Sequence, residues 1–328
     1  MSFEFIAIGD ITTDAFIKLS DAHINKNLKD GSKELCVRFA DKIPYDKVTL
    51  VPAVGNAPNA AVAAARLGLK SALHTNLGDD MFGEEDLVQL KKQGVATDLV
   101  RVHKGQPSNY HFVLWFKAER TILVKHYDYE YKLEDLGSPW WIYVSSLGEA
   151  GLPLHDQIAD YLEENPDIKM AFQPGTFQIK CGYERLERIY KRTEVFFCNV
   201  QEAQDILESS EGHGGKLARE MVSRGPKIAC ITDGPLGAFA CDGTDTWFMP
   251  IYPDENPPYE RTGAGDAFSS TVAIALSLGK SLPEALRWGP INSMSAVQKI
   301  GAQEGLLTRE QLLEYLEKAP VDYQPKKL

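Results

Sequence analysis

Short apolar runs alternate with helix-like patterns along most of this chain. Such an alternation is typical of parallel strands joined by crossover helices. The expected strands are 5–8, 71–76, 141–144, 169–172, 195–198 and 228–232. The expected helices are 59–67, 83–93, 154–164, 184–191, 202–207, 215–224, 267–278, 282–289, 292–300 and 309–317. We therefore expect an α/β fold in which the central sheet carries helices on both faces.

Two regions, at about 12–54 and about 108–131, do not follow this alternation and contain no long helical pattern. Their β-rich pieces are 36–39, 47–51 and 110–116. These pieces could pair into a small antiparallel sheet over the carboxyl edge of the main sheet, where α/β proteins bind ligands. Ordinary surface hairpins are the alternative. We expect one domain over residues 1–320, with residues 321–328 as a polar tail.

Composition argues against several classes of protein. With 44% hydrophobic residues in 328, the chain can bury a large core. Its formal net charge of -11 and the lack of a long Lys/Arg run argue against binding to nucleic acid. The five cysteines form no Cys-x-x-Cys pair, so neither a zinc site nor a disulfide framework is indicated, and a reducing cytoplasm fits best. No stretch approaches the ~20 apolar residues that cross a membrane.

The sequence Thr262-Gly-Ala-Gly-Asp266 precedes a long apolar run, so its small residues lie at the first turn of an expected helix. The N–H groups of Gly263, Ala264 and Gly265 would form an anion site, because a helix start leaves them unpaired and carries partial positive charge. Asp266 would stand beside them as a base that takes a proton from a hydroxyl. The alternative is a glycine turn whose Asp merely favours the helix start.

A second cluster, Gly55-Asn-Ala-Pro-Asn59, begins an alanine-rich helical pattern. Gly55 permits close approach, and the amides of Asn56 and Asn59 offer donors and acceptors to a polyhydroxylated ligand such as a sugar. A simple helix cap by Asn56 is the alternative. Asp10 and Asp14 follow the first expected strand in a loop at the same edge, where a carboxylate accepts hydrogen bonds from vicinal hydroxyls, although Asp is also common in turns.

Two further polar groups follow expected strands. Asn199 and Glu202, three residues apart, can orient waters on Mg²⁺ or contact phosphate oxygens, and a helix cap by Asn199 is the alternative. Thr232, Gly234 and Gly237 form either a nucleotide-binding edge or a tight turn.

Other cofactor-binding motifs fail on inspection. Gly279-Lys-Ser281 has Ile274 where a P-loop needs glycine, and Phe268 stands where a dinucleotide fingerprint has its third glycine. We therefore expect neither a P-loop nor hydride chemistry. The histidines show no ligand spacing, so His111 and His126 are expected to be structural or solvent-exposed, with ligand contact by His126 as a lesser option.

The order of these motifs resembles the ribokinase-like (PfkB) family of carbohydrate kinases over essentially the whole chain. The resemblance is carried by Gly9-Asp10 with Asp14, Gly55-Asn-Ala-Pro-Asn59, Gly78-Asp-Asp-Met-Phe-Gly83, Asn199-x-x-Glu202, Thr232-Asp-Gly234, Thr262-Gly-Ala-Gly-Asp266 and Asn292. It implies a three-layer α/β/α sandwich with a mostly parallel central sheet and a small β-sheet lid, to which the two insertions correspond. It also implies ATP- and Mg²⁺-dependent transfer of the γ-phosphoryl group to a primary hydroxyl.

The resemblance implies a role for each candidate residue. Asp266 would be the base, and the N–H groups of Gly263, Ala264 and Gly265 the anion hole. The sugar would be held by Asp14, Gly55, Asn56 and Asn59, with Glu149 as a weaker candidate. Phosphate and metal would be served by Asn199 and Glu202, the latter through water. The nucleotide would be lined by Thr232, Gly234, Gly237 and Asn292.

The chain departs from the family just before the glycines, where Asp-Thr-Thr is common and this chain has Glu260-Arg261-Thr262. That segment helps to bind a monovalent cation in ribokinase-like members, so activation by K⁺ is left open here. Arg261 would bring a positive charge to the phosphates, or else face solvent. The family's lid often also forms a dimer contact, which implies a homodimer.

The sequence does not choose the acceptor. The motif at Gly55 looks closer to fructokinase-like and ketodeoxygluconate kinase-like members than to typical ribokinases, and the family also includes nucleoside kinases. The lid offers polar groups to a sugar acid and aromatic rings to a nucleobase, namely Asn109, His111, Arg120 and Lys125, and Tyr110, Phe112 and Trp115. A fructose-, ribose- or ketodeoxygluconate-like sugar ranks first and a nucleoside second. A sensor without catalysis ranks last, because Asp266 and the glycines are present.

Overall fold

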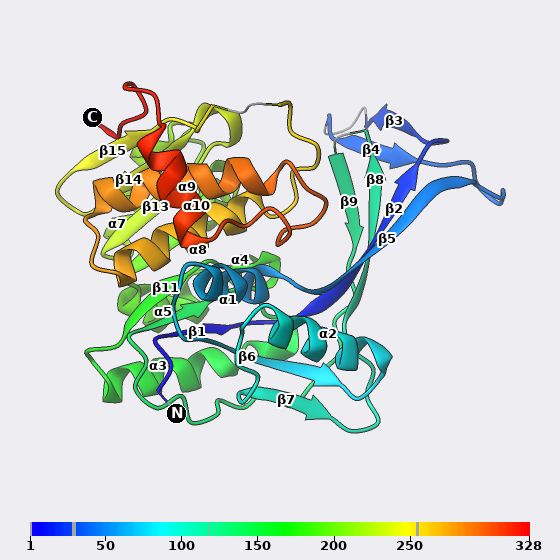
Figure 1. Cartoon of the computed structure of the whole chain (residues 1–328), viewed down its shortest axis with the longest axis horizontal. Coiled ribbons are helices and arrows are strands. Elements are labelled where there is room, and N and C mark those ends of the chain that lie inside the picture. The colour runs from blue at the N-terminus through cyan, green and yellow to red at the C-terminus, as the bar shows by residue number, and fades with distance from the viewer. Residues whose placement is uncertain (1, 28–30, 118, 254–255) are drawn as a thin grey trace.

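The computed structural model describes residues 2–27, 31–117, 119–253 and 256–328. The parallel strands of its central sheet are β1 (Phe5–Ile8), β6 (Ser71–Gly78), β7 (Val100–His103), β10 (Trp141–Val144), β11 (Lys169–Phe172), β12 (Val195–Asn199) and β13 (Ile228–Thr232). Antiparallel strands extend one end: β14 (Ala238–Cys241), β15 (Thr246–Met249) and β16 (Lys326–Lys327). The order is β16-β15-β14-β13-β12-β11-β10-β1-β6-β7 (Figure 1).

Helices cover both faces of this sheet, because successive side chains of a strand point to opposite sides. In β1, Phe5 and Ala7 belong to one apolar core, and Ile6 and Ile8 to the other. The first core is completed by α1 (Asn56–Arg66), α2 (Met81–Lys92), α8 (Ala264–Ser277), α9 (Leu282–Ala296) and α10 (Arg309–Glu317). The second is completed by α3 (Leu154–Glu164), α5 (Glu187–Arg192), α6 (Val200–Leu207) and α7 (Gly214–Ser223). The three-layer α/β/α fold is thereby confirmed.

The six strands expected from the sequence are present, whereas β7, β14, β15 and β16 were not expected and other local expectations differ from the structure. The two helices expected at 282–289 and 292–300 are one helix, α9, because burial of α9 outweighs the helix-breaking tendency of Pro290 inside it. The helix α4 (Thr176–Cys181) was not expected, since so short a helix leaves no clear periodicity. Residues 37–39 are not a strand: β4 ends at Cys36 (Lys33–Cys36) and pairs with β3 (His23–Lys26).

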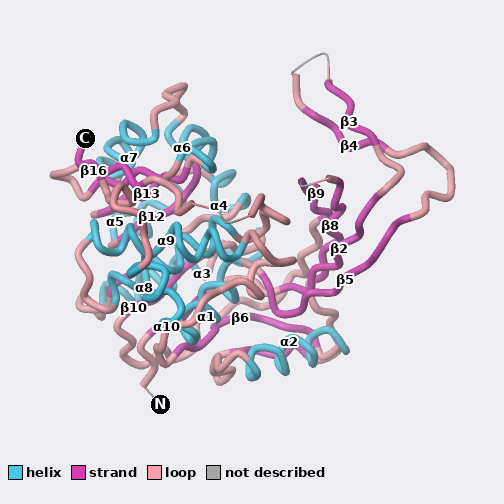
Figure 2. Tube along the Cα trace, turned by 45° about the horizontal axis from the view of Figure 1, so that its top comes forward, coloured by secondary structure: helices cyan, strands magenta, loops and turns pink. Residues whose placement is uncertain are grey.

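The two insertions form a four-stranded sheet, called the lid below, which stands beside the body in Figures 1 and 2. Its strands, in the order β5-β2-β8-β9, are β5 (Tyr45–Val54), β2 (Thr12–Leu19), β8 (Tyr110–Phe116) and β9 (Glu119–Leu123). The expected all-antiparallel pairing was wrong, because β2 and β8 run in the same direction and pair in parallel. The lid therefore joins the two insertions at this one pair of strands.

The expected polar tail packs onto the body. The buried Tyr323 donates its hydroxyl to the carbonyl of Arg287, and β16 pairs with β15. The amide of Leu328 also donates to the carbonyl of Thr246. In the part of the chain that the structure describes, no helix has the length and apolar character needed to cross a membrane.

Candidate active site

A cavity of about 630 Å³, called the main cavity below, lies between the lid and the carboxyl ends of the central strands. Residues that follow five neighbouring parallel strands line it: Asp10 after β1, Ser146 after β10, Gln173 after β11, Asn199 at the end of β12 and Thr232 at the end of β13. The starts of α1 and α8 and the lid strands β2, β8 and β9 complete the wall. The cavity therefore occupies the position expected for a ligand site in an α/β fold.

Asp266 lies in the first turn of α8, at the wall of the main cavity, with its carboxylate held by three amide groups. Asn56 Nδ2 donates to Oδ1 over 2.9 Å, and Asn59 Nδ2 donates to Oδ2 over 2.8 Å. Gln173 Nε2 donates to Oδ1 over 3.0 Å, and the oxygen of the same amide accepts from Tyr143. The starts of two helices and the end of β11 thus fix one carboxylate.

The glycines around Asp266 have different local roles. Gly263 is the N-cap of α8 with φ 78°, and a Cβ there would lie 2.2 Å from the Cβ of Ala302, so the position requires glycine. Gly265 is exposed and faces open space at the cavity. Ala264 does not line the main cavity, and its N–H contacts the carbonyl of Arg261 over 3.4 Å. Of the three residues expected to form the anion hole, Gly263 and Gly265 therefore line the main cavity.

The start of α1 decides between the two interpretations of Asn56. Gly55, not Asn56, is the N-cap, and no side chain caps this helix. The amide of Asn56 is therefore free to contact Asp266. Gly55 has φ 125°, and a Cβ there would meet the carbonyl oxygen of Asp10 at 2.8 Å. The glycine lets the two loops pass close to each other.

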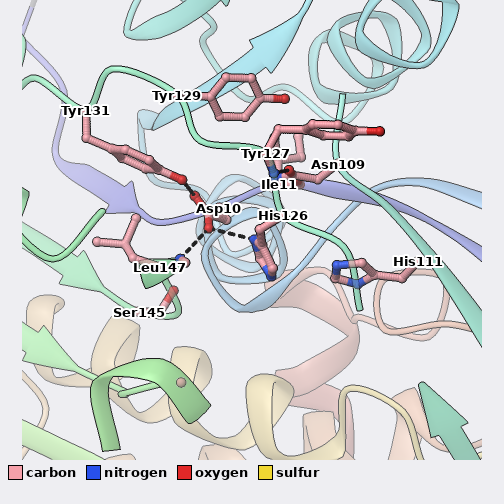
Figure 3. A network of polar contacts seen from close by, with 12 residues as sticks. Asp10, Ile11, Asn109, His111, His126, Tyr127, Tyr129, Tyr131, Ser145 and Leu147 are labelled. Carbon is pink, nitrogen blue, oxygen red and sulfur yellow. Dashed lines mark hydrogen bonds and ion pairs between the residues drawn. The ribbon is translucent and has the colours of Figure 1, made fainter. Parts of the chain in front are cut away.

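Asp10 is buried at the end of the main cavity and lies at the centre of a polar network (Figure 3). Its Oδ1 accepts from the hydroxyl of Tyr131 over 2.7 Å, and its Oδ2 accepts from the N–H of Gly148 over 2.6 Å. Nδ1 of His126 lies 2.9 Å from Oδ2. Burial, together with the charge of Asp10, raises the pKa of Tyr131, so this phenol stays protonated as a donor.

Asp14 and His111 face each other across the parallel pair β2 and β8, whose register aligns these two residues. Oδ1 of Asp14 lies 3.4 Å from Nδ1 of His111, and the rings of His111 and His126 are 5.3 Å apart (Figure 3). The sequence predicted a loop at Asp14, but this residue lies inside strand β2. Both histidines line the main cavity, each beside a carboxylate, so neither is solvent-exposed in the way the sequence allowed.

Asn199 and Glu202 form a reciprocal cap at the start of α6 and also line the main cavity. Asn199 Oδ1 accepts from the N–H of Glu202, and Glu202 Oε2 accepts from the N–H of Asn199, both over 2.9 Å. The two residues therefore cap α6 and line the main cavity at the same time. Burial raises the pKa of Glu202, which is the response of a carboxyl group that lacks a positive neighbour.

This carboxyl group fits a magnesium ion that is bound mainly by nucleotide and water. Only Oε2 of Glu202 takes part in the cap, and the residue also lines the main cavity. Across the described residues, no group of three or more His, Cys, Asp or Glu side chains is placed to hold a metal. One carboxylate with waters and phosphate oxygens is a common arrangement for Mg²⁺.

An adjoining cavity of about 390 Å³ shares Thr232, Arg261 and Gly265 with the main cavity. Gly234 and Gly237, which were expected to contact a nucleotide, line it. Both have positive φ, 51° and 104°, and a Cβ on Gly237 would meet the carbonyl oxygen of Met249 at 2.5 Å. Apolar residues such as Ile251, Phe268 and Val297 form much of the wall.

Two expected site residues lie elsewhere. Glu149 is exposed and outside the main cavity, because the chain turns outward in a short 3-10 helix directly after Gly148 has bonded to Asp10. Asn292 is fully buried, donates to Thr271 Oγ1 over 2.8 Å and accepts from the N–H of Leu307 over 2.9 Å. Asn292 ties α9 to α8 and to a following loop, and its neighbour Ser293 lines the adjoining cavity instead.

The lid contacts the loop before α8 through two ion pairs. Glu119 Oε1 lies 3.3 Å from Arg261 Nη1, and Arg120 Nη1 lies 4.0 Å from Oε1 of the buried Glu260. The Glu260 carboxylate also accepts from the N–H and the hydroxyl of Thr262. Arg261 lines both cavities and its side chain is half-exposed, so it lies at the rim where they meet.

Sequence reasoning missed Gln173, Phe177 and Lys180, which all line the main cavity. Gln173 directly follows a buried strand, and this signal was available because the carboxyl ends of parallel strands share one edge. Phe177 and Lys180 come from α4, and the ring of Phe177 lies 5.8 Å from that of His126. No sequence signal indicated this short helix.

Comparison with known proteins gives one family. Residues 37–309 match the model described as pfkB family carbohydrate kinase. A ribokinase of Bacillus subtilis is 27% identical over 270 residues, which cover 80% of this chain and 87% of that protein. A 5-dehydro-2-deoxygluconokinase of Bacillus velezensis is 22% identical over 333 residues, which cover 96% and 94%. In fold, the chain is similar to Arabidopsis thaliana ribokinase complexed with ribose and ATP, with a TM-score of 0.77, 18% identity, and coverage of 97% and 99%.

Proposed function

The chain belongs to the pfkB family of carbohydrate kinases, and we propose that it transfers the γ-phosphoryl group of ATP to a primary hydroxyl of a small sugar. As a carbohydrate kinase, it is a phosphotransferase with an alcohol group as acceptor. The observation that carries the proposal is the position of Asp266. This carboxylate lies at a helix start in the main cavity, and its neighbour Gly265 lines both cavities. A sugar and a nucleotide in the two cavities would therefore meet beside Asp266.

In the proposed reaction the sugar hydroxyl oxygen attacks the γ-phosphorus, its proton passes to the Asp266 carboxylate, and ADP leaves. The amides of Asn56, Asn59 and Gln173 hold that carboxylate in one orientation. The N–H groups in the first turn of α8, where Gly265 leaves open space, stabilise the charge on the transferring phosphoryl group.

Glu202, with Asn199 beside it, would hold Mg²⁺ through water, as the fit of this carboxyl group supports. When bound to the nucleotide, Mg²⁺ would neutralise charge on the phosphate oxygens. Thr232, Gly234 and Gly237 would line the nucleotide. Arg261, at the rim between the cavities, would contact phosphate, since a guanidinium is a good partner for phosphate oxygens.

The acceptor end of the main cavity is proposed to comprise Asp14, Gly55, Asn56 and Asn59, together with His111 and His126. Two carboxylates, Asp10 and Asp14, each lie beside one histidine there. Such alternating acceptors and donors suit the vicinal hydroxyls of a sugar. The neighbouring rings of Phe177 and His126 would instead suit a nucleobase, so a nucleoside is the second candidate.

The substrate is tested by ADP release from Mg-ATP with ribose, fructose, 2-keto-3-deoxygluconate, adenosine and cytidine, each with and without K⁺. Release with one of the three sugars supports the proposal and identifies the acceptor. Release with the nucleosides alone would replace it by a nucleoside kinase. Comparing the rates with and without K⁺ tests whether a monovalent cation activates the enzyme, although the buried Glu260 stands where the family commonly has Asp.

The lid offers a surface for a second copy of the chain. Register places Leu50, Ala15, Phe112 and Leu123 in one row across the lid. Leu50, Phe112 and Leu123 are 54%, 45% and 52% exposed. Asp14 and His111, one residue earlier on their strands, belong to the opposite face and line the main cavity. The outer face is thus apolar, and we expect it to pair with the same face of a second subunit.

A further inference from the structure

A separate cavity of about 580 Å³ lies at the base of the lid. Its walls come from β5, the last residue of α1, the end of α2, and the loop 298–304. It shares no lining residue with the main cavity or with the adjoining cavity. We call it the basal cavity. None of the residues discussed for phosphoryl transfer lines it.

Positive charge gathers in the basal cavity. Lys47, Arg66 and Lys299 line it, whereas among the described lining residues only Glu304 carries a carboxylate. Within the part of the chain that the structure describes, none of the three cations is paired with a carboxylate at salt-bridge distance. This balance is unlike that of the whole chain, whose formal net charge is -11. The cavity is therefore a local positive site on an acidic protein.

Arg66 is the central cation of this cavity and is fixed in place. Its Nε and Nη2 donate to Gln93 Oε1 over 3.2 and 2.9 Å, and its Nη1 donates to the carbonyl of Leu306 over 2.5 Å. These partners are neutral oxygens. Burial lowers the pKa of Arg66, and the charge of Glu304 raises it to a smaller extent. An anion in the cavity would offset the effect of burial.

The remaining groups suit the rest of a small ligand. Gln89 of α2 and Gln93, which caps the end of that helix, are four residues apart, and Gln298 and Gln303 add two more amides from the facing loop. The ring of Tyr259 is 51% exposed at the cavity and contacts Trp115, with 5.5 Å between the ring centres. Amides and one anchored aromatic ring can contact hydroxyls and a flat or apolar group.

We propose that the basal cavity is a second ligand site, which binds a phosphate-bearing small molecule with its anionic end between Arg66 and Lys299. The volume of the cavity, its three cations and its amides carry this inference. It goes beyond the kinase reaction and does not depend on which sugar is the acceptor.

Hydrogen bonds connect the basal cavity to Asp266. Gln303, which lines the basal cavity, donates its Nε2 to Asn59 Oδ1 over 3.0 Å and to the carbonyl of Ala53 over 2.6 Å. Asn59 in turn donates to Asp266. Ala53 has φ 59°, a conformation that residues other than glycine rarely adopt, at the end of lid strand β5. A ligand here would thus lie next to the junction of lid, sugar loop and Asp266.

Pyrophosphate tests the proposal by calorimetric titration of the whole protein, with and without a saturating non-hydrolysable ATP analogue and Mg²⁺. The analogue fills the phosphate positions of the nucleotide site. We expect pyrophosphate to bind while the analogue is present. Arg66→Gln should weaken this binding at least ~10-fold, because the charge-assisted hydrogen bond to the anion is lost. Pyrophosphate binding that the analogue abolishes would assign the anion to the nucleotide site and overturn the proposal.

A second variant keeps the test decisive if Arg66→Gln fails to fold. Lys47→Gln/Lys299→Gln changes two exposed side chains and should weaken pyrophosphate binding at least about threefold, with the affinity for the ATP analogue unchanged. Lys104→Gln, an exposed lysine outside the cavity, is the matched control and should bind like the wild type. Equal affinity in the double variant and in the wild type would refute the site.

Discussion

Arg261 of the loop before α8 pairs with Glu119 of lid strand β9, with 3.3 Å between Nη1 and Oε1. Arg261 is half-exposed and Glu119 is more exposed still, so the pair itself contributes little to stability. Its importance lies in its position, because Arg261 also lines both cavities. The lid therefore holds a cation at the rim where sugar and nucleotide are proposed to meet.

The two members of this pair should respond differently to neutralisation. If Arg261 contacts phosphate, Arg261→Gln should lower kcat/KM by roughly tenfold, since a charge-assisted hydrogen bond is lost. Glu119→Gln removes the same ion pair and should stay within about twofold of the wild type. Steady-state kinetics with Mg-ATP as the varied substrate measures both. Equal losses in the two variants would show that the ion pair, rather than phosphate contact, is what matters.

Asp266→Asn tests the proposed base. An amide at this position cannot take the proton of the acceptor hydroxyl, so kcat should fall at least ~10²-fold. Nucleotide affinity, measured by calorimetry, should change little. Asp205→Asn, an exposed Asp on α6, is the control and should retain full activity. Unchanged turnover in Asp266→Asn would eliminate the assignment.

Gln173 is expected to position Asp266 rather than to contact the reacting atoms. Gln173→Leu removes the donor to Oδ1 and should lower kcat roughly tenfold while KM for the sugar stays nearly constant. Tyr143→Phe removes only the hydroxyl that holds the Gln173 amide, so its effect should be in the same direction and smaller. A rise in KM at constant kcat would instead indicate direct sugar binding by Gln173.

Asp86 ties α2 to the two strands that enter the lid from the first insertion. It is fully buried and accepts from the N–H of Ala53 over 2.6 Å and from Thr13 Oγ1 over 2.9 Å. Burial raises the pKa of Asp86 to about 7. Because this pKa lies above the value of roughly 3.9 for an unfolded Asp, the folded chain keeps a proton that the unfolded chain releases. The contribution of Asp86 to stability therefore falls as pH rises from about 4 to about 7.

Asp86→Asn should remove that pH dependence, since an amide does not titrate and can still accept at Oδ1. The free energy of unfolding of the wild type should fall relative to the variant by up to ~1.4 kcal/mol per pH unit in this range. Urea unfolding of both proteins at pH 5, 6 and 7 measures the difference. A constant difference across the three pH values would contradict the raised pKa.

The dimer is tested on the outer face of the lid. Phe112→Glu places a charge in the middle of the apolar row and should convert a dimer into monomers in size-exclusion chromatography with light scattering. Leu313→Glu replaces a similarly exposed apolar residue on α10 and should leave the mass unchanged. A wild-type protein that elutes as a monomer would refute this role of the lid.

The sequence predicted what depends on local pattern. The buried strands appear as short apolar runs, and the position of Asp266 follows from the small residues before a helix. The neighbourhood of Asp14 and His111 was not predictable, because it depends on the parallel register of two distant strands. Asn292 was misassigned since a shift of one residue on a helix turns a side chain from a cavity to the interior, and here Ser293 faces the cavity.

The parallel pair in the lid also constrains how the chain folds during synthesis. Thr13 pairs with Tyr110, so β2 leaves the ribosome long before its partner β8. Until β8 arrives, a hairpin of β2 and β5 would leave the edge of β2 without its partner, and the apolar residues Ala15 and Ile17 belong to that strand. Nascent chains are therefore most prone to misassociate at this intermediate length, and slower translation through the segment between the insertions would prolong that exposure.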